Sequence, residues 1–506
     1  MDFSQFDSLK SDSVDVMLLL EGTYPFVSGG VSVWVADIIE SMPTIRFGIV
    51  FLGAWPSLYK KLYFKLPANL VHLEIHFLFP ELLKSSGQDK KNSKINTCPH
   101  IHQKEKICTL HENFLTLQEG MFSDLANPKN NLFNADYFLY SKESWEYMVE
   151  SYEKHAAEPS FIDYFWTVRN IHTPLWTLGK ILKKLIPAKL LHSPSTGYAG
   201  FLGCLASESL KIPLITTEHG IYTRERYLEL IRSPLVQAKN QLENTSKDFD
   251  YLKTMWLKFF DTLSRLTYQR SSYIIGLYEG ARLVQINMGA DKNKTRVIPN
   301  GINIDKFKNL KLNKNKSDKK IVGLIGRLVR IKSTLNYIRA LGIVTHHLKN
   351  IEGWICFIGS EEEDYIAEAK LLVKTLDLSD VVKFVENKTS AELLVDLDLL
   401  VLSSVSEGMP LTVLEAFATG VPVVVSDVGS CKELVEGKNK EDSLLGLAGL
   451  VVPSNNVEAL AHAMMELLSS EEKLNAAGLI AQKRVNLYYN QDLMISEYQK
   501  VYGEFL

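Results

Sequence analysis

Six short apolar segments in the second half of the chain constrain its fold most. Each is rich in aliphatic residues, and a helical pattern or its equivalent separates each from the next. They lie at 320–326, 353–359, 381–386, 398–404, 421–427 and 448–454. Short apolar runs without alternation are typical of parallel strands that are buried on both faces. The pattern therefore predicts an α/β domain with a six-stranded Rossmann-like sheet.

The first half of the chain begins with the same pattern. An apolar strand at 14–22 is followed by the loop "TYPFVSGG", a helix and a second strand at 45–53. Further strands, or strands followed by loops, are expected within 70–79, 189–200, 212–220 and 273–278. A chain of 506 residues is also too long for one hydrophobic core. We therefore predict two Rossmann-like domains.

The domain boundaries follow from where these patterns stop. We place the N-terminal domain at 1–306, with a partly helical insertion of weak periodicity at about 80–165. The C-terminal domain is expected at 307–485, after a lysine-rich stretch at 307–320 that is typical of a solvated linker. Residues 486–506 are set apart as a C-terminal segment, in which one amphipathic helix is predicted from 488.

The composition excludes several classes of protein. The chain has 56 basic and 59 acidic residues, a balance that argues against a nucleic-acid partner. The N-terminus has no signal-peptide pattern, and no segment has the roughly 18 apolar residues that a membrane span needs. The five cysteines are scattered, as in a reducing compartment. These features favour a cytoplasmic protein.

Two groups of residues were considered as metal sites. The first lies in the insertion, where the spacing does not match the paired ligands of structural zinc sites; it comprises Cys98, His100, His102, Cys108 and His111. The second, Asp396 and Asp398, stands at a helix-to-strand junction before a buried strand. We favour an exposed insertion and a structural junction, so no metal site is predicted.

Basic residues follow the first strand of the C-terminal domain. Arg327 and Lys332 lie five positions apart, where the strand at 320–326 has ended and a helix is about to begin. A guanidinium and an ammonium group in this position can bind a diphosphate. Taken alone, the pair is equally compatible with two cations on a solvated loop.

The stretch "SEGMPLTVLEAFATG" at 406–420 strengthens the first interpretation. It follows another strand, and a helix is predicted to start near Leu411, after Pro410. The free amides of the first helical turn suit a phosphate; they belong to Met409, Leu411 and Thr412. Glu407 precedes the helix, and Glu415 lies one turn inside it, where it can accept hydrogen bonds from a diol such as ribose. Glu415 alone is also compatible with stabilisation of the first helical turns.

These motifs resemble those of the retaining glycosyltransferases of family 4. The resemblance covers most of the chain and rests on "SGG" (28–30), "PNGI" (299–302), "GR" (326–327), the segment 401–427 and "GLVVP" (449–453). It implies the GT-B fold, in which two Rossmann-like domains face each other across a cleft and the C-terminal helix returns to the N-terminal domain. It also implies a nucleotide-sugar donor, no cofactor and no metal.

The resemblance assigns roles to individual residues. It implies that Arg327 and Lys332 bind the donor diphosphate and that Glu415 holds the ribose hydroxyls. It also implies that Glu407 binds sugar hydroxyls and helps to position the developing oxocarbenium ion. His219, in "TEHG" after a strand, is implied to reach the transferred sugar, although a lone histidine is more often structural.

Other residues are implied to complete the donor site. Gly29 and Gly30 allow close approach of backbone amides, and Val385 contacts the base, although "FVEN" differs from the family pattern there. Arg224 and Arg226 fit either a substrate contact or an ion network on a helix. Asn300 and Gly301 are expected to shape the hinge between the domains.

Two stretches, "LLEGTYPFVSGGVSVWV" and "TEHGIYTRER", resemble the Pel exopolysaccharide glycosyltransferases of bacterial biofilms. This resemblance implies a UDP donor, with UDP-GalNAc, UDP-GlcNAc and UDP-glucose all open, and a polysaccharide acceptor. It also implies partners in an inner-membrane Pel synthase complex, which would bring a cytoplasmic protein to the membrane periphery.

Three alternatives remain open from the sequence. A nucleotide-sugar epimerase of the same fold would interconvert the sugar without an acceptor. An NAD oxidoreductase is disfavoured because neither Gly-rich turn reads GxGxxG and no acidic residue stands out for an adenosine ribose. A protein that only binds nucleotides would show affinity without turnover.

Overall fold

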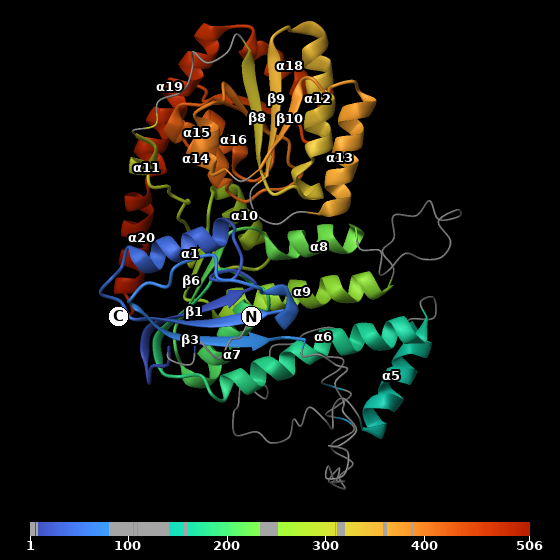
Figure 1. Ribbon diagram of the computed structural model, residues 1–506. Helices are drawn as coiled ribbons and strands as arrows, with labels where there is room; N and C mark the ends of the chain where they lie inside the picture. The colour runs from blue at the N-terminus through green and yellow to red at the C-terminus, as the bar shows by residue number, and fades with distance from the viewer. Residues whose placement is uncertain are drawn as a thin grey trace.

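The computed structural model describes residues 9–79, 141–155, 160–232, 251–308, 319–357, 362–386 and 388–506, and a few isolated positions. In this part of the chain, two parallel sheets form two α/β domains, which lie one above the other in Figure 1. The Cys/His cluster of the insertion and most of the predicted linker lie outside the described residues.

The N-terminal sheet has seven parallel strands in the order β3-β2-β1-β4-β5-β6-β7. The strands are β1 (Val14–Glu21), β2 (Phe47–Gly53), β3 (Leu70–Phe77), β4 (Ala188–Ser193), β5 (Leu214–Glu218), β6 (Tyr273–Gly276) and β7 (Thr295–Val297). All were predicted except β7. This edge strand has only three residues, "TRV", and no apolar run marks it.

Successive side chains of a strand point to opposite faces, so alternate residues of β1 pack in the hydrophobic cores on the two faces of the N-terminal sheet. Val16, Leu18 and Leu20 pack under α1 and the C-terminal helix, whereas Met17 and Leu19 pack on the other face. The helices of this domain are α1 (Gly30–Glu40), α5 (Lys142–His155), α6 (Phe161–Leu182), α7 (Tyr198–Leu210), α8 (Tyr222–Arg232), α9 (Tyr251–Arg270), α10 (Glu279–Asn287) and the short η2 (Pro56–Leu58). The described end of the predicted insertion is therefore helical, and α6 contributes to the domain core.

The C-terminal sheet has six parallel strands, as predicted, and they lie in the order β10-β9-β8-β11-β12-β13. The strands are β8 (Lys320–Gly326), β9 (Ile351–Phe357), β10 (Val382–Val385), β11 (Leu399–Leu402), β12 (Val423–Ser426) and β13 (Gly449–Val452). Helices cover both faces, so β9, β11 and β12 are fully buried, whereas β10 at the edge of the sheet is only partly buried. They are α11 (Asp305–Lys308), η6 (Arg330–Lys332), α12 (Thr334–His347), α13 (Glu363–Thr375), α14 (Ser390–Leu394), α15 (Leu411–Thr419), α16 (Cys431–Glu436), α17 (Lys440–Ser443) and α18 (Val457–Leu468).

Two helices join the domains at the C-terminal end. In Figure 1, α19 (Glu471–Tyr488) runs along the C-terminal domain, and α20 (Gln491–Gly503) continues down to the N-terminal domain. Hydrogen bonds hold α20 on the N-terminal sheet, between Tyr502 and His192 at 2.6 Å and between Tyr498 and Thr217 at 3.1 Å. This confirms the predicted return of the C-terminal helix.

The predicted start of the last helix at residue 488 is wrong. Tyr488 ends α19, and α20 begins only after Asn490, whose side chain accepts a hydrogen bond from the amide of Asp492. An asparagine at the N-cap favours a new helix start over continuation of the old one. The turn between the helices is also paired with the hinge, because Ile302 and Asn490 form a parallel β-bridge.

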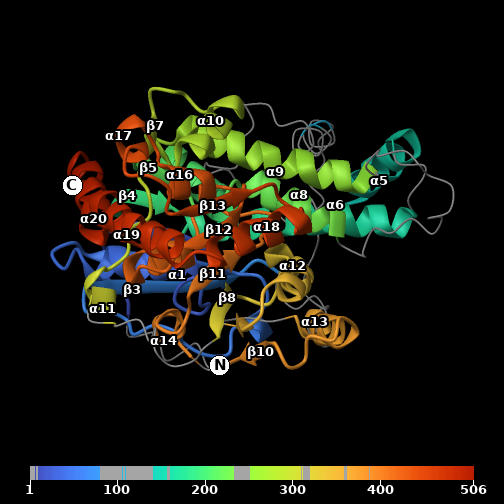
Figure 2. The same cartoon turned by 90° about the horizontal axis from the view of Figure 1, so that it is seen from above.

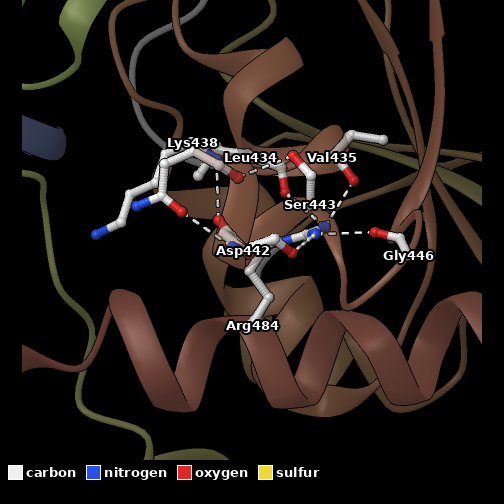
Figure 3. Close-up of polar contacts among 8 residues, drawn as sticks. Leu434, Val435, Lys438, Asp442, Ser443, Gly446 and Arg484 are labelled. Carbon is white, nitrogen blue, oxygen red and sulfur yellow. Dashed lines mark hydrogen bonds and ion pairs between the residues drawn. The ribbon is translucent and has the colours of Figure 1, made fainter.

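A fully buried ion pair anchors α19 to the C-terminal domain (Figure 3). The side chains of Arg484 and Asp442 are 0% exposed, and Arg484 Nε donates to Asp442 Oδ1 at 2.7 Å. The other guanidinium nitrogens donate to backbone carbonyls of Leu434, Val435, Asp442 and Gly446. The guanidinium is thus surrounded by acceptors, as a buried charge requires.

Among the helices of the described part, none combines the length and the apolar character needed to cross a bilayer.

Candidate active site

Residues from both sheets gather at the carboxyl ends of their strands. In the N-terminal domain Gly30 begins α1, which follows β1, and His219 follows β5 directly. In the C-terminal domain Arg327 follows β8, and Glu407 lies between β11 and α15. Ligands of open parallel sheets bind beyond these strand ends, so the predicted residues lie where a ligand is expected.

The loops at the strand ends of the two domains are in direct contact at Gly408. A Cβ atom added to Gly408 would overlap the carbonyl oxygen of His219, so position 408 has no room for a side chain. Nearby, a Cβ on Gly30 would lie 3.7 Å from Cδ1 of Leu411, the first residue of α15. The loops after β1 and β5 therefore lie directly against the start of α15.

Lys332 and Glu407 form an ion pair, with 2.6 Å between Nζ and Oε1. Their side chains are only 17% and 10% exposed. The hydroxyl of Ser403 donates to the carbonyls of Lys332 and Ser333, both at 3.0 Å, and so holds the backbone that carries Lys332. The sequence assigned each of the two groups to the donor separately, and their pairing was not predicted.

Arg327 has an exposed side chain and acts electrostatically on Glu225 of the opposite domain. Burial raises the pKa of Glu225 to about 7, and the positive charges of Arg226 and Arg327 oppose the rise. Glu225 was not predicted from the sequence, although it stands between Arg224 and Arg226. Of the charged groups that act on Glu225, only Arg327 comes from a distant part of the sequence.

The N-terminus of α15 is open to a ligand. Pro410 is the N-cap residue and no side chain caps the helix, so its first amides are available to an anion. Leu411 and Thr412 are partly exposed there. Met409 is buried, and its carbonyl accepts a hydrogen bond from Asn300 Nδ2 at 3.4 Å. The start of α15 therefore lies where the sequence predicted it.

Glu415 lies one turn inside α15 and is partly exposed. Burial raises its pKa, while a hydrogen bond with Ser390 and the charge of Lys306 oppose the rise. The carboxylate thus has a polar environment at the surface of the helix. This explains how a glutamate is accommodated in an otherwise apolar helix.

His219 is neutral at physiological pH, because burial lowers its pKa to about 3. Its ring packs against the indole of Trp34, with ring centroids 4.8 Å apart in an edge arrangement. Within the described residues, Nε2 of His219 is buried and has no hydrogen-bond partner. A neutral imidazole with a free nitrogen can bind a hydroxyl group of a ligand.

The remaining predicted residues lie around this centre. A Cβ on Gly29 would meet no atom within 4 Å, and Val385 ends β10 and is partly exposed. Arg226 pairs with Glu229 at 2.8 Å and stacks on Tyr222, which is the ion network considered as one alternative. Arg224 is exposed.

Asn300 and Gly301 lie at the crossing between the domains. The amide of Gly301 contacts Sδ of Met494 in α20 at 3.3 Å. A Cβ on Gly301 would lie 2.6 Å from the carbonyl oxygen of Asn490, so the segment around Gly301 and the start of α20 approach closely.

Asp398, one of the two aspartates weighed as a metal ligand, has a structural role. Asp398 accepts a hydrogen bond from the amide of Ile321 at 2.7 Å and so joins the start of β11 to β8. In the described part of the chain, no group of three or more His, Cys, Asp or Glu side chains is arranged to hold a metal ion.

Two family models match the chain. Residues 14–293 match the family described as a domain of unknown function, DUF3492. Residues 305–484 match the family of glycosyl transferases group 1, and this range contains Arg327, Lys332 and Glu407.

The matches to curated relatives cover only part of each relative's sequence. An N-acetylgalactosaminyltransferase of Campylobacter jejuni that acts on N,N'-diacetylbacillosaminyl-diphospho-undecaprenol is 29% identical over 49% of this chain and 64% of its own. The mannosyltransferase LpsB of Rhizobium meliloti is 31% identical over 31% of this chain and 44% of its own. The chain thus spans 64% of the first relative and 44% of the second.

Solved structures match over nearly the whole chain. The sucrose-phosphate synthase of Thermosynechococcus elongatus has a TM-score of 0.58 at 15% identity, covering 97% of this chain and 98% of its own. HepE of Anabaena, solved with UDP-glucose, has the same TM-score and identity and covers 97% and 99%. These similarities confirm the predicted fold of two Rossmann-like domains, GT-B.

The family assignment rests on the longer of the two sequence matches. It covers more than half of the chain and includes the N-terminal sheet up to β6, while the second match covers nearly all of the C-terminal sheet domain. The chain therefore belongs to the DUF3492 family, and its C-terminal half carries a glycosyl transferases group 1 domain.

Proposed function

We propose that this protein is a retaining glycosyltransferase that transfers a hexose or N-acetylhexosamine from a UDP-sugar to a growing polysaccharide. The observation that carries the proposal is the group formed by Arg327, the Lys332–Glu407 ion pair and the uncapped start of α15. Two cations and a helix N-terminus are a suitable receptor for a diphosphate. The group lies within the glycosyl transferases group 1 match.

Each part of the donor has a candidate partner. The diphosphate is bound by Arg327, Lys332 and the first amides of α15, the ribose by Glu415, and the base beside Val385. Glu407 and His219 bind the transferred sugar, with Gly29 and Gly30 leaving room for it. HepE, with the same fold, was solved with UDP and with UDP-glucose, which supports a uridine nucleotide as the donor.

The reaction requires stabilisation of the charge that develops on the leaving diphosphate. Arg327 and Lys332 supply positive charge at that point, so we propose that no metal ion is needed. Glu407 is paired with Lys332 and stabilises positive charge on the sugar as the bond to phosphate breaks. We propose that the anomeric configuration is retained because the acceptor hydroxyl attacks the anomeric carbon from the same face that the diphosphate leaves.

For the acceptor, we propose a polysaccharide of the Pel type, and hence a PelF-like role with membrane-bound partners. The support is the sequence resemblance of the loops after β1 and β5. Several matched relatives are named for bacterial polysaccharide synthesis, including AmsK of Erwinia amylovora and CapM of Staphylococcus aureus. UDP-GalNAc, UDP-GlcNAc and UDP-glucose remain the candidate donors.

The test is a panel of these UDP-sugars incubated with the purified protein, with the release of UDP and the fate of the sugar both measured. Release of UDP with formation of a glycoside or free sugar supports a transferase. Interconversion of the UDP-sugar without release of UDP would instead identify an epimerase. NMR of the product tests retention, since the linkage must keep the anomeric configuration of the donor.

Replacing Gly408 by alanine tests the contact between the domains. The added methyl group overlaps the carbonyl of His219, so the loop that carries His219 and the loop that carries Gly408 must move apart. We expect transfer to fall by roughly 10- to 100-fold, because small displacements of reacting groups are costly, while UDP affinity changes little. The control is Gly179→Ala, because a Cβ there meets no atom within 4 Å. Equal rates for both variants would show that this contact is unimportant.

A further inference from the structure

The imidazole of His219 is held by packing and not by hydrogen bonds. Within the described residues its side chain makes no hydrogen bond or ion pair, and its buried Nε2 has no partner. A histidine that acts on a ligand usually bonds its other ring nitrogen to a carboxylate or a carbonyl, which orients the ring. In the described part of the chain, the one aromatic ring that His219 contacts is the indole of Trp34, with centroids 4.8 Å apart and planes at 67°.

Trp34 lies one turn into α1, directly under the loops of the site. Residues four positions apart share a face of a helix, so Trp34 is on the same face as Gly30. Gly30 is in turn the residue whose added Cβ would lie 3.7 Å from Leu411 at the start of α15. The indole is only 2% exposed, so it supports the site from the core and is not open to a ligand.

Two further rings hold Trp34 in the core. The ring of Tyr498 in α20 and that of His192 in β4 each have their centroid 5.4 Å from the indole. Tyr498 also shares a hydrogen bond of 3.1 Å with Thr217, which lies two residues before His219. Figures 1 and 2 both show α20 beside α1. The C-terminal helix therefore supports both Trp34 and the strand that carries His219.

The two histidines that contact Trp34 differ in their hydrogen bonds. Both ring nitrogens of His192 are paired, Nδ1 with the hydroxyl of Tyr502 at 2.6 Å and Nε2 with that of Thr217 at 2.9 Å. His192 is thus a structural part of the core. His219 keeps Nε2 free for a ligand, and the packing of Trp34 takes the place of the hydrogen bonds that fix His192.

We propose that Trp34 is a positioning residue for sugar transfer: its indole sets the angle at which the imidazole of His219 meets a hydroxyl group of the transferred sugar. The inference rests on the proposed function, in which His219 binds that sugar. Edge-to-face packing of two rings is favourable and directional, because the edges of aromatic rings are positive and their faces negative. An aliphatic side chain in place of Trp34 would fill space without orienting the imidazole.

The experiment compares Trp34→Leu with Trp34→Phe, each in the otherwise unchanged protein and together with His219→Ala. Leucine removes the ring, whereas phenylalanine keeps one. The kcat for UDP release is measured with the UDP-sugar that the panel identifies and with water as the acceptor. UDP affinity is measured by calorimetry for each variant, because it reports folding and the diphosphate site, which His219 does not contact in the proposed function.

The matched control is Phe47→Leu. Phe47 is fully buried in the same hydrophobic core, where its ring packs on Tyr502 at 6.5 Å. It makes no ring contact with His219 in the described part of the chain, so this variant removes a buried aromatic ring without touching the imidazole. Trp34→Met, with a longer and more adaptable side chain, replaces Trp34→Leu if the leucine variant does not bind UDP.

We expect Trp34→Leu to lower kcat by roughly 10- to 100-fold, because small displacements of a group that contacts the reacting sugar are costly. UDP affinity should be retained, and Trp34→Phe should recover most of the lost rate. In the His219→Ala protein, Trp34→Leu should change kcat by less than about threefold, because residues that act as a unit lose their effects together. Phe47→Leu should leave kcat near that of the unchanged protein.

Four results would overturn the inference alone. They are an unchanged kcat in Trp34→Leu, losses that multiply when Trp34→Leu and His219→Ala are combined, an equal loss in Phe47→Leu, and a parallel loss of UDP affinity in both Trp34→Leu and Trp34→Met. A wild-type kcat in His219→Ala would instead overturn the proposed role of His219. Failure of the wild-type protein to bind or release UDP would overturn the proposed function, and the inference with it.

Discussion

Replacing Lys332 by alanine is expected to weaken UDP binding by roughly 100-fold. A hydrogen bond to a charged group contributes about 1.5–3 kcal/mol to binding, and the loss of the ion pair with Glu407 weakens binding further. Without this partner, Glu407 presents an uncompensated negative charge to the diphosphate. Turnover should fall further than binding, because the charge on the leaving group grows in the transition state. Calorimetry with UDP and steady-state kinetics measure the two losses.

Arg330 provides the matched control for Lys332. It lies in the same short helix, η6, but its guanidinium points to the surface and pairs with Glu368 of α13 at 3.0 Å. Arg330→Ala removes the same formal charge and should leave UDP affinity within about threefold, because exposed ion pairs contribute little. An equal loss in both variants would mean that only the overall charge of the loop matters, which would contradict specific binding by Lys332.

Replacing Arg484 by alanine is expected to destabilise the protein by about 3–5 kcal/mol, the cost of removing one partner from a buried ion pair. Asp442 would remain fully buried with its charge uncompensated, and four backbone carbonyls would lose their donor. Chemical denaturation, followed by tryptophan fluorescence, measures the change in the free energy of unfolding.

The control for this change is Lys473→Ala on the same helix. Lys473 pairs with Glu466 at 2.7 Å, and both side chains are more than half exposed. Removal of this exposed pair should cost no more than about 1 kcal/mol. A similarly small loss for Arg484→Ala would show that the network in Figure 3 contributes little to stability.

The order of elements was predictable because burial on both faces makes parallel strands continuous apolar runs. This pattern marks β8 as "KIVGLIG" and β12 within "VPVVVSD", and it fails for β7, whose three residues lie at the sheet edge. The start of α20 was missed because helical periodicity continues through Tyr488 to Asn490, and only the N-cap geometry of Asn490 separates the two helices.

The candidate site was predictable where a residue lies close in sequence to a strand end. Arg327 and Lys332 follow β8, and the start of α15 is marked by Pro410. The partners of these residues were not predictable, because they come from distant segments. Lys332 meets Glu407 across 75 positions, and Glu225 faces Arg327 from the other domain. The roles of Arg327 and Lys332 remain predictions for their alanine variants.

Calorimetric titration of the purified protein with UDP, GDP, ADP and NAD tests whether the site binds a uridine nucleotide without a metal ion. Each titration is repeated with EDTA and with Arg327→Ala. We expect UDP to bind selectively, EDTA to leave its affinity unchanged, and the substitution to weaken it strongly. Binding of NAD in preference to UDP, or loss of UDP binding in EDTA, would mean that the cleft is not a metal-independent site for a UDP-sugar.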